Sequence, residues 1–306
     1  MKQQQQWTSL ILYCLFIIGI QACRESVPLN PNTIVHDSQY RLLAAPQTQT
    51  VLVLLPCFSC SMQHTEEEAL FLKNLTESGI STILLNINQK LWLEKSDKLM
   101  CAQFLQNIFL RHQLPADKVF IGGFSSGGNV ALLLTNYMLK QPQMIHPKGV
   151  FVVDSPIDLV QLYENSQQTL QHSSVEVACT EAQEVIQLLS QKLGDPTENF
   201  ANYSRYSPFL LQNGNLSNIE QLKNIKVRLY TEPALEWQQK ARQRTYKELN
   251  AYMLEKLYTT LKPQSKSAVE FIQTHNKGVR ADGSIHPHSW SIVDRESLLQ
   301  WLLADS

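Results

Sequence analysis

Short apolar runs alternate with amphipathic stretches along most of the chain. Runs bounded by proline, glycine or charged residues are typical of strands buried on both faces. Between two of them, Ser96–Gln113 places Met100, Phe104 and Ile108 four residues apart, which is typical of an amphipathic helix. The alternation predicts an α/β fold, with a mostly parallel central sheet and helices on both faces, because parallel strands need helical crossovers. The expected strands are Thr50–Pro56, Ile80–Ile87, Asp117–Phe124, Lys148–Asp154, Ile225–Pro233 and Ser267–Thr274.

Four more helices are expected from the same patterns. The first begins at Thr65, a residue type that caps helices, and ends at Gly79. Residues 155–223 differ from the rest, because they are polar, rich in Gln and Asn and without a convincing strand. They predict a helical cap inserted into one domain that spans residues 33–306. The remaining expected helices are Ser126–Lys140, Trp237–Leu261 and Ile292–Leu303.

The first 22 residues have the pattern of an export signal. Lys2 supplies a positive start, and Leu10–Ile20 is an almost unbroken apolar run. That run is shorter than the roughly 20 residues that span a bilayer, and it fits the apolar region of a signal peptide. The following "GIQAC" resembles a bacterial lipoprotein signal, which implies cleavage before Cys23 and a lipid on Cys23. A simple secretory signal or an uncleaved anchor is the alternative.

These N-terminal features predict an exported protein with a lipid anchor in a bacterial membrane. Residues 1–22 are the expected signal peptide and residues 23–32 a short tether. Arg24 stands where an aspartate is associated with inner-membrane retention in some bacteria, which favours the outer membrane, on its periplasmic or surface face.

Composition and charge narrow the range of partners. The chain has 306 residues, of which 43% are hydrophobic, enough for a sizeable core, and its net charge is −1. The chain has no strong electrostatic field and no basic tract interleaved with aromatic residues, so a nucleic-acid partner is not expected. Cys57 and Cys60 could form a disulfide in an exported protein. The preferred interpretation is that they are two small residues in a turn, and the alternative is a redox pair. No spacing of Cys and His is typical of a zinc site, so no metal is expected.

The stretch "VFIGGFSSGGNVALLL" places small residues where a strand ends and a helix begins. Gly123-Phe124-Ser125-Ser126-Gly127 matches the G-x-S-x-G pattern, in which a sharp turn exposes the central serine and leaves room only for small flanking residues. The helix that starts at Ser126 directs the positive end of its dipole toward Ser125.

The chain resembles the α/β-hydrolase superfamily. The features that carry the resemblance are this turn, the strand–helix alternation, the inserted cap and a histidine loop before the last helix. The resemblance covers most of the chain after the signal. It implies that Ser125 is a nucleophile and that a histidine after the last strand is its base. In "HPHSWSIVD", His288 is the preferred base, with Trp290 able to buttress its ring, and His286 is the next candidate.

The carboxylate that orients the base stays open between two residues. The superfamily usually supplies it just after the penultimate strand, where this chain has Glu232. The alternative is Asp154 at the end of "FVVD", a position that some members use. Asp158 is interpreted as a helix cap or a solvated turn residue. A Ser–His dyad without a carboxylate is a further possibility.

The oxyanion site implied by the resemblance uses backbone N–H groups. One would come from Ser126 and the other from the turn after the first apolar strand, at Phe58 or Cys57. The "HGGG" motif of one esterase branch is missing. The expected activity is hydrolysis of a small carboxylic ester or related acyl bond through an acyl-enzyme on Ser125, without a cofactor. The alternative is a non-catalytic surface lipoprotein that keeps the fold for binding.

Overall fold

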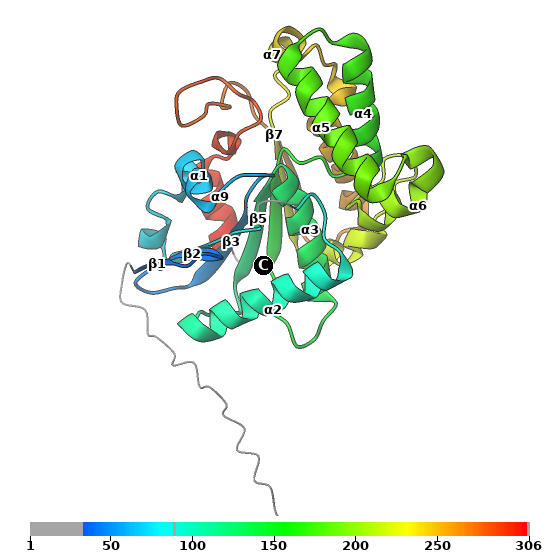
Figure 1. The fold of residues 1–306 in the computed structure, drawn as a ribbon. Helices are drawn as coiled ribbons and strands as arrows, with labels where there is room; N and C mark the ends of the chain where they lie inside the picture. The colour runs from blue at the N-terminus through cyan, green and yellow to red at the C-terminus, as the bar shows by residue number, and fades with distance from the viewer. Residues whose placement is uncertain (1–32, 88–89, 305–306) are drawn as a thin grey trace, which may run out of the picture.

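The structure is a computed structural model that describes residues 33–87 and 90–304. Within these residues, eight strands form a single sheet in the order β1-β2-β4-β3-β5-β6-β7-β8 (Figure 1). β2 runs antiparallel to both of its neighbours, and all pairs from β4 to β8 are parallel. The expected signal peptide (residues 1–22), the tether (residues 23–32) and Cys23 lie outside the described residues. In the described part of the chain, no helix has both the length and the apolar character that crossing a membrane requires.

The apolar runs of the sequence form the inner strands of the sheet. β3, β4, β5, β6 and β7 are buried along their whole lengths, as expected for strands covered on both faces. The sequence pattern does not indicate β1 and β2, because these strands of three and four residues are only partly buried and carry no continuous apolar run. The strands are β1 (Ile34–His36), β2 (Tyr40–Leu43), β3 (Thr50–Leu55), β4 (Ile80–Leu85), β5 (Val119–Phe124), β6 (Gly149–Val153), β7 (Lys226–Thr231) and β8 (Val269–Gln273).

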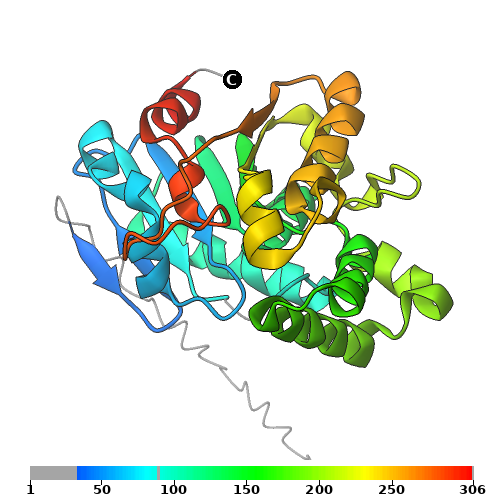
Figure 2. The ribbon, with the colours of Figure 1, turned by 90° about the horizontal axis from the view of Figure 1, so that it is seen from above.

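Two apolar cores lie on opposite faces of the sheet. Along β3, Val51 and Val53 belong to one core and Leu52 and Leu54 to the other, which follows from the two-residue period of a strand. α2, α3 and α8 close the first core, whereas α1, the short 3-10 turns after it and α9 close the second (Figure 2). These helices are α1 (Met62–Glu68), α2 (Lys95–His112), α3 (Ser126–Leu139), α8 (Asn250–Leu261) and α9 (Arg295–Leu303).

The polar stretch between β6 and β7 is helical and lies at one side of the sheet (Figure 1). Its helices share a small apolar cluster of their own, which includes Leu159, Tyr163 and Leu189. At the end of α4, the backbone N–H of Ser174 donates to Oε1 of Gln243 at 2.8 Å, which joins these helices to the segment after α7. The helices are α4 (Leu159–His172), α5 (Glu176–Leu193), α6 (Pro196–Tyr206) and, after β7, α7 (Leu235–Arg242).

Three expected helices differ from those in the structure. The segment expected as one helix over Thr65–Gly79 is α1 followed by two short 3-10 turns, and the helix expected from Ile292 begins at Arg295. α1 begins before Thr65, because the hydroxyl of Ser61 accepts a hydrogen bond from the backbone N–H of His64 at 3.0 Å and so caps the helix. The Thr65 hydroxyl instead donates to the Ser61 carbonyl. The helix expected over Trp237–Leu261 is two helices, because Gln243 adopts φ 56° and ends α7.

Candidate active site

β5 and α3 meet at Ser125 in a strained turn. Ser125 has φ 54° and ψ −126°, a conformation that residues with a side chain adopt mainly at functional turns. Its backbone N–H donates to the Val153 carbonyl at 2.9 Å, so the end of β6 holds the turn. A Cβ atom at Gly123 would lie 2.1 Å from the Gly127 carbonyl oxygen, and one at Gly127 would lie 2.3 Å from the Pro56 carbonyl oxygen. Only glycine at these two positions lets β3, β5 and α3 converge beside Ser125.

Asp154, the residue after β6, is hydrogen-bonded to His288. Nδ1 of His288 lies 2.6 Å from Oδ2 of Asp154. An ionised carboxylate can only accept a hydrogen bond, so it favours the tautomer in which Nδ1 carries the proton and Nε2 keeps its lone pair. The two residues are 134 positions apart, and only the parallel sheet brings the end of β6 to the loop after β8. The structure thus gives His288 the alternative carboxylate, Asp154, as its partner.

Asp154 is held by neighbouring strands and by α8. Its backbone N–H donates to the Tyr230 carbonyl at 2.9 Å, and its carbonyl accepts from Nδ2 of Asn250 at 2.9 Å. Its Oδ1 accepts from the Thr231 hydroxyl at 3.0 Å. These contacts hold a backbone φ of 45°, in the left-handed region that a residue with a side chain enters at a cost. Sequence reasoning missed Thr231 and Asn250, because neither belongs to a motif and only the fold brings them to Asp154.

Glu232, the preferred acid in the sequence analysis, has other partners, and the structure corrects that assignment. Its carboxylate, in a residue only 4% exposed, accepts hydrogen bonds from the backbone N–H groups of Lys277 (2.9 Å) and Gly278 (3.1 Å) and from the Thr274 hydroxyl (2.9 Å). Among the described residues, it has no bond to His288. After β8 the chain turns back over the end of β7. Backbone N–H groups of residues 277 and 278, which precede His288 in the loop, therefore occupy the carboxylate of Glu232. Glu232 therefore anchors the start of the loop that carries His288.

His286, the alternative base, supports the backbone of His288. Its Nδ1 lies 3.0 Å from the His288 carbonyl oxygen, and its ring packs on Trp237 with centroids 5.1 Å apart. Burial, followed by the nearby charge of Arg280, lowers the pKa of His286 to about 4. The ring is therefore neutral near pH 7, and Nδ1 donates to the carbonyl. In the described chain, no carboxylate pairs with His286.

Trp290 supports the ring of His288 indirectly. Phe124, the residue before Ser125, packs on His288 with ring centroids 4.5 Å apart. Trp290 is 1% exposed and packs on the same Phe124 at 5.3 Å. The stack links the imidazole to the strand that ends at Ser125, and so places the two residues at one edge of the sheet.

Two segments near Ser125 carry backbone N–H groups without a hydrogen-bond partner among the described residues. Ser126 is the first residue of α3, where a backbone N–H has no acceptor within the helix. In the turn after β3, the N–H groups of Cys57 and Phe58 have no hydrogen-bond partner among the described residues. The contact of Pro56 with Gly127 brings this turn against the start of α3. The sequence analysis expects the oxyanion donors in these two segments, and backbone N–H groups can bind a negative oxygen.

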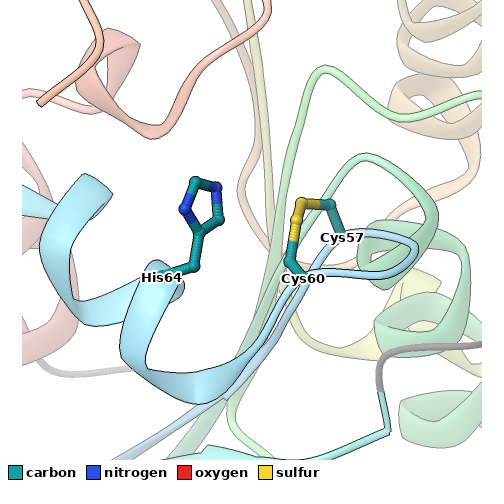
Figure 3. Close-up of side chains that lie close together, drawn as sticks. All are labelled: Cys57, Cys60 and His64. Atoms are coloured by element: carbon teal, nitrogen blue, oxygen red, sulfur yellow. A yellow bond between two sulfur atoms is a disulfide. The ribbon is translucent and has the colours of Figure 1, made fainter. Parts of the chain in front are cut away.

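The same turn is closed by a disulfide between Cys57 and Cys60, a pairing that the sequence left open (Figure 3). The ring of His64, from α1, lies alongside it; the two sulfur atoms and a ring nitrogen are all within 4.8 Å of one another. Two thiolates and an imidazole form a common set of zinc ligands, but sulfur atoms joined in a disulfide are not thiolates. Neither Cys101 nor Cys179 forms a disulfide within the described residues.

The site therefore holds the parts that acyl transfer to a serine requires. Ser125 stands, partly exposed, at the strand-to-helix turn, His288 has a free Nε2, Asp154 is a buried acceptor on its other nitrogen, and unpartnered N–H groups lie nearby. Asp158 is confirmed as a helix cap, since Oδ1 accepts from the N–H groups of Val160 and Gln161 at the start of α4.

Comparison with solved structures shows the same fold. An esterase from Rhizomucor miehei superposes with a TM-score of 0.53 at 12% identity, over 88% of this chain and 81% of that one. An esterase/lipase from an uncultured bacterium gives 0.53 at 12% identity, over 90% and 86%. The Francisella virulence factor BioJ gives 0.53 at 14% identity, also over 90% and 86%. At such low identities the similarity shows the fold alone.

The sequence itself matches a family. No curated protein gives a significant match to the chain. A sequence model of the steryl acetyl hydrolase family matches residues 51–219, more than half of the chain, a range that includes Ser125 and Asp154. With the eight-stranded sheet and the esterase neighbours, the match supports an ester hydrolase. The chain belongs to the steryl acetyl hydrolase family, within the α/β-hydrolase superfamily.

Proposed function

We propose that this protein is a serine hydrolase that cleaves carboxylic esters through an acyl-enzyme on Ser125. The observation that carries the proposal is the 2.6 Å hydrogen bond between His288 Nδ1 and Asp154 Oδ2, at the edge of the sheet where β5 ends in Ser125. A serine hydroxyl is a poor nucleophile without a base. A neutral imidazole whose Nδ1–H is held by a buried carboxylate is such a base, with Nε2 free to accept the proton.

In the acylation step, Nε2 of His288 removes the hydroxyl proton of Ser125 while Oγ attacks the ester carbonyl carbon. Asp154 stabilises the imidazolium that forms, and the strained elbow presents Oγ to the substrate. The carbonyl oxygen becomes negative and accepts hydrogen bonds from the N–H of Ser126 and from that of Phe58 or Cys57. The imidazolium then donates its proton to the alcohol oxygen, which leaves.

The deacylation step repeats this chemistry with water. His288 accepts a proton from water, the hydroxide attacks the acyl carbon, and Ser125 leaves as an alcohol after taking the proton back. Every proton is carried by His288, so these residues complete the cycle without a cofactor.

We further propose that the substrate is an acetyl or other short-chain ester of an apolar alcohol. The family description names an acetyl ester of a sterol. The loops at this edge of the sheet expose large apolar side chains, which an apolar alcohol can contact. These are Phe58 in the turn after β3, Leu235 after β7, and Val279 and Ile285 in the loop after β8.

A fluorophosphonate probe tests the catalytic proposal. Such a probe forms a covalent bond with an activated serine, so we expect the wild type to be labelled and Ser125→Ala not. Ser126→Ala is the matched control: it removes a neighbouring hydroxyl but keeps the backbone N–H, and we expect it to be labelled. A folded wild type that is not labelled and does not cleave aryl acetates would exclude the hydrolase and favour the binding protein.

We also propose that Cys23 carries a lipid that anchors the protein to a bacterial membrane. The support is the N-terminal sequence, with its short apolar run and "GIQAC". The test is metabolic labelling with an alkyne fatty acid. We expect labelled protein in the membrane fraction for the wild type and unlabelled protein for Cys23→Ala. Equal labelling of both would disprove the anchor at Cys23.

A further inference from the structure

The proposed ester hydrolysis does not use the Cys57–Cys60 disulfide, yet the disulfide closes the turn that supplies an oxyanion donor. The turn contains Phe58, whose N–H is unpartnered in the described chain, and Ser59, whose φ is 61°. A residue with a side chain seldom adopts this left-handed conformation. Apart from the disulfide, one hydrogen bond closes the turn, from the Cys60 N–H to the Cys57 carbonyl at 3.1 Å. The covalent bond therefore contributes much of what holds this conformation.

The disulfide is accessible from one side. Cys57 packs against the second apolar core, whereas Cys60 does not belong to either core. Between them, Phe58 and Ser59 are exposed, and both Cys57 and Cys60 are partly exposed. A small thiol can thus approach Sγ of Cys60, and Sγ of Cys57, on the side of the core, is the leaving group.

His64 is placed to serve this disulfide. One of its ring nitrogens lies within 4.8 Å of both sulfur atoms (Figure 3). Its ring has no hydrogen-bond partner among the described residues, so it is free to exchange a proton with a sulfur atom. Disulfide exchange depends on how readily the departing thiolate is stabilised, and an adjacent imidazole can supply it with a proton.

We propose that Cys57, Cys60 and His64 form a thiol-exchange site, which a dithiol reductant opens and which positions the oxyanion turn only while the disulfide is closed. The effect on catalysis rests on the proposed function, whereas the exchange itself does not. The ligand class is a small dithiol. The predicted consequence is an esterase that is active when oxidised and weak when reduced.

The chemistry balances within one dithiol. A thiolate of the reductant attacks Sγ of Cys60, the S–S bond breaks, and Sγ of Cys57 leaves as a thiolate that is protonated through His64. The second thiol of the reductant then attacks the mixed disulfide at the reductant's own sulfur and releases Cys60. Two electrons pass to the protein, the reductant leaves as a cyclic disulfide, and its two protons end on Cys57 and Cys60.

The test uses the full chain with the other cysteines removed, so that only this pair can react. The substitutions are Cys14→Ser, Cys23→Ser, Cys101→Ser and Cys179→Ser. Turnover of an aryl acetate is measured before and after anaerobic treatment with dithiothreitol, which is removed because thiols cleave aryl esters. We expect kcat to fall about 10- to 100-fold with KM within about twofold, since loss of one oxyanion donor costs about 10²–10³-fold in kcat. Reoxidation should restore kcat.

Further variants separate the parts of the proposal. The double variant Cys57→Ala/Cys60→Ala, once circular dichroism shows that it is folded, should have the kcat of the reduced protein. Treatment with dithiothreitol should not change that kcat. His64→Gln should slow reduction, followed by alkylation and mass spectrometry, about five- to tenfold, whereas His172→Gln, an exposed histidine at the end of α4, should not.

Two results would overturn the inference. A fully reduced protein that keeps the kcat of the oxidised one would show that the disulfide does not position the turn. Equal reduction rates in His64→Gln and His172→Gln would show that His64 takes no part in the exchange. Failure of the proposed function looks different: neither the oxidised nor the reduced protein would turn over ester, while the exchange rates would still be measurable.

Discussion

β6 and β7 lie side by side in the sheet, and each ends in a buried carboxylate with different partners. Asp154 follows β6 and accepts a hydrogen bond from His288, a group that can gain a proton. Glu232 follows β7 and accepts hydrogen bonds from Lys277 and Gly278 N–H groups and from the Thr274 hydroxyl, none of which changes charge near neutral pH. Equivalent positions at one edge of a sheet thus carry an electrostatic role and a structural role.

The difference between the two carboxylates lies in their partners. Both are buried, so burial does not distinguish them. Asp154 faces the His288 imidazole, which becomes positive during turnover in the proposed mechanism, whereas Glu232 holds the loop that carries this imidazole. Removing the charge at each position should therefore affect different quantities.

The largest effect is expected for Asp154→Asn. An amide at this position can no longer hold the Nδ1–H of His288 or stabilise the imidazolium, so kcat should fall about 10³–10⁴-fold with little change in KM. The measurement is steady-state turnover of an aryl acetate, and Asp117→Asn, at an exposed aspartate, is the control. Activity within tenfold of the wild type would contradict the role of Asp154 and reopen the Ser–His dyad.

Glu232→Gln should affect stability more than chemistry. The amide offers an NH₂ group where the loop presents N–H donors, so at least one buried hydrogen bond is lost. We expect the free energy of unfolding to fall by about 1–3 kcal/mol and kcat to fall less than about tenfold. Denaturant unfolding and turnover are measured together, with the exposed Glu236→Gln on α7 as control. If kcat fell as far as in Asp154→Asn, the two carboxylates would not have separate roles.

Thr231→Val tests how much the hydrogen bond from Thr231 to Asp154 contributes to kcat, and we expect a smaller effect than for Asp154→Asn. The substitution keeps the shape of the side chain but removes the hydroxyl that donates to Oδ1 of Asp154 at 3.0 Å. A hydrogen bond of about 1.4 kcal/mol corresponds to about tenfold in rate, so we expect kcat to fall about three- to tenfold. Thr231→Ser keeps the donor and should retain kcat. Equal loss in both variants would indicate a packing effect instead.

The smallest effect concerns His286, in the loop that Glu232 anchors. The pKa of His286 is lowered to about 4 in the folded state by burial, against about 6.5 in the unfolded chain. Between these values the unfolded chain binds more protons, so this group makes stability fall as the pH falls from about 6.5 to about 4. His286→Phe cannot be protonated, so the stability advantage of the wild type over the variant should shrink across this window.

Urea unfolding of both proteins at several pH values between 4 and 7 measures this difference. Contributions of other groups, including the buried His112 whose pKa is also lowered by burial, cancel between the two proteins. A stability difference that does not vary with pH would show that His286 is not held neutral by its surroundings.

Much of the fold could be predicted from the sequence, because its signals are local. Buried parallel strands are continuous apolar runs, and β3 to β7 appear as such. The elbow at Ser125 is also local, since Gly123 and Gly127 are needed by atoms of their own segment and of the neighbouring strand. β1 and β2 could not be predicted, because partly buried strands of three or four residues look like loop sequences.

The site was predictable only in part. Ser125 and His288 stand at positions marked by a motif and by chain order, and the turn after β3 is marked by the end of an apolar run. The support of the histidine ring by Phe124, and of Asp154 by Thr231 and Asn250, involves residues far apart in sequence and in no motif.

Local signals in the sequence predict the succession of strands and helices from β3 onward, the serine turn and two candidate carboxylates. The choice between those carboxylates depends on the folded chain. A hydrogen bond requires positions to within a few tenths of an ångström, and the path of the loop after β8 sets those positions. Along that path, backbone N–H groups lie next to Glu232 and His288 lies next to Asp154. The residues around either acid do not indicate which of the two contacts the histidine.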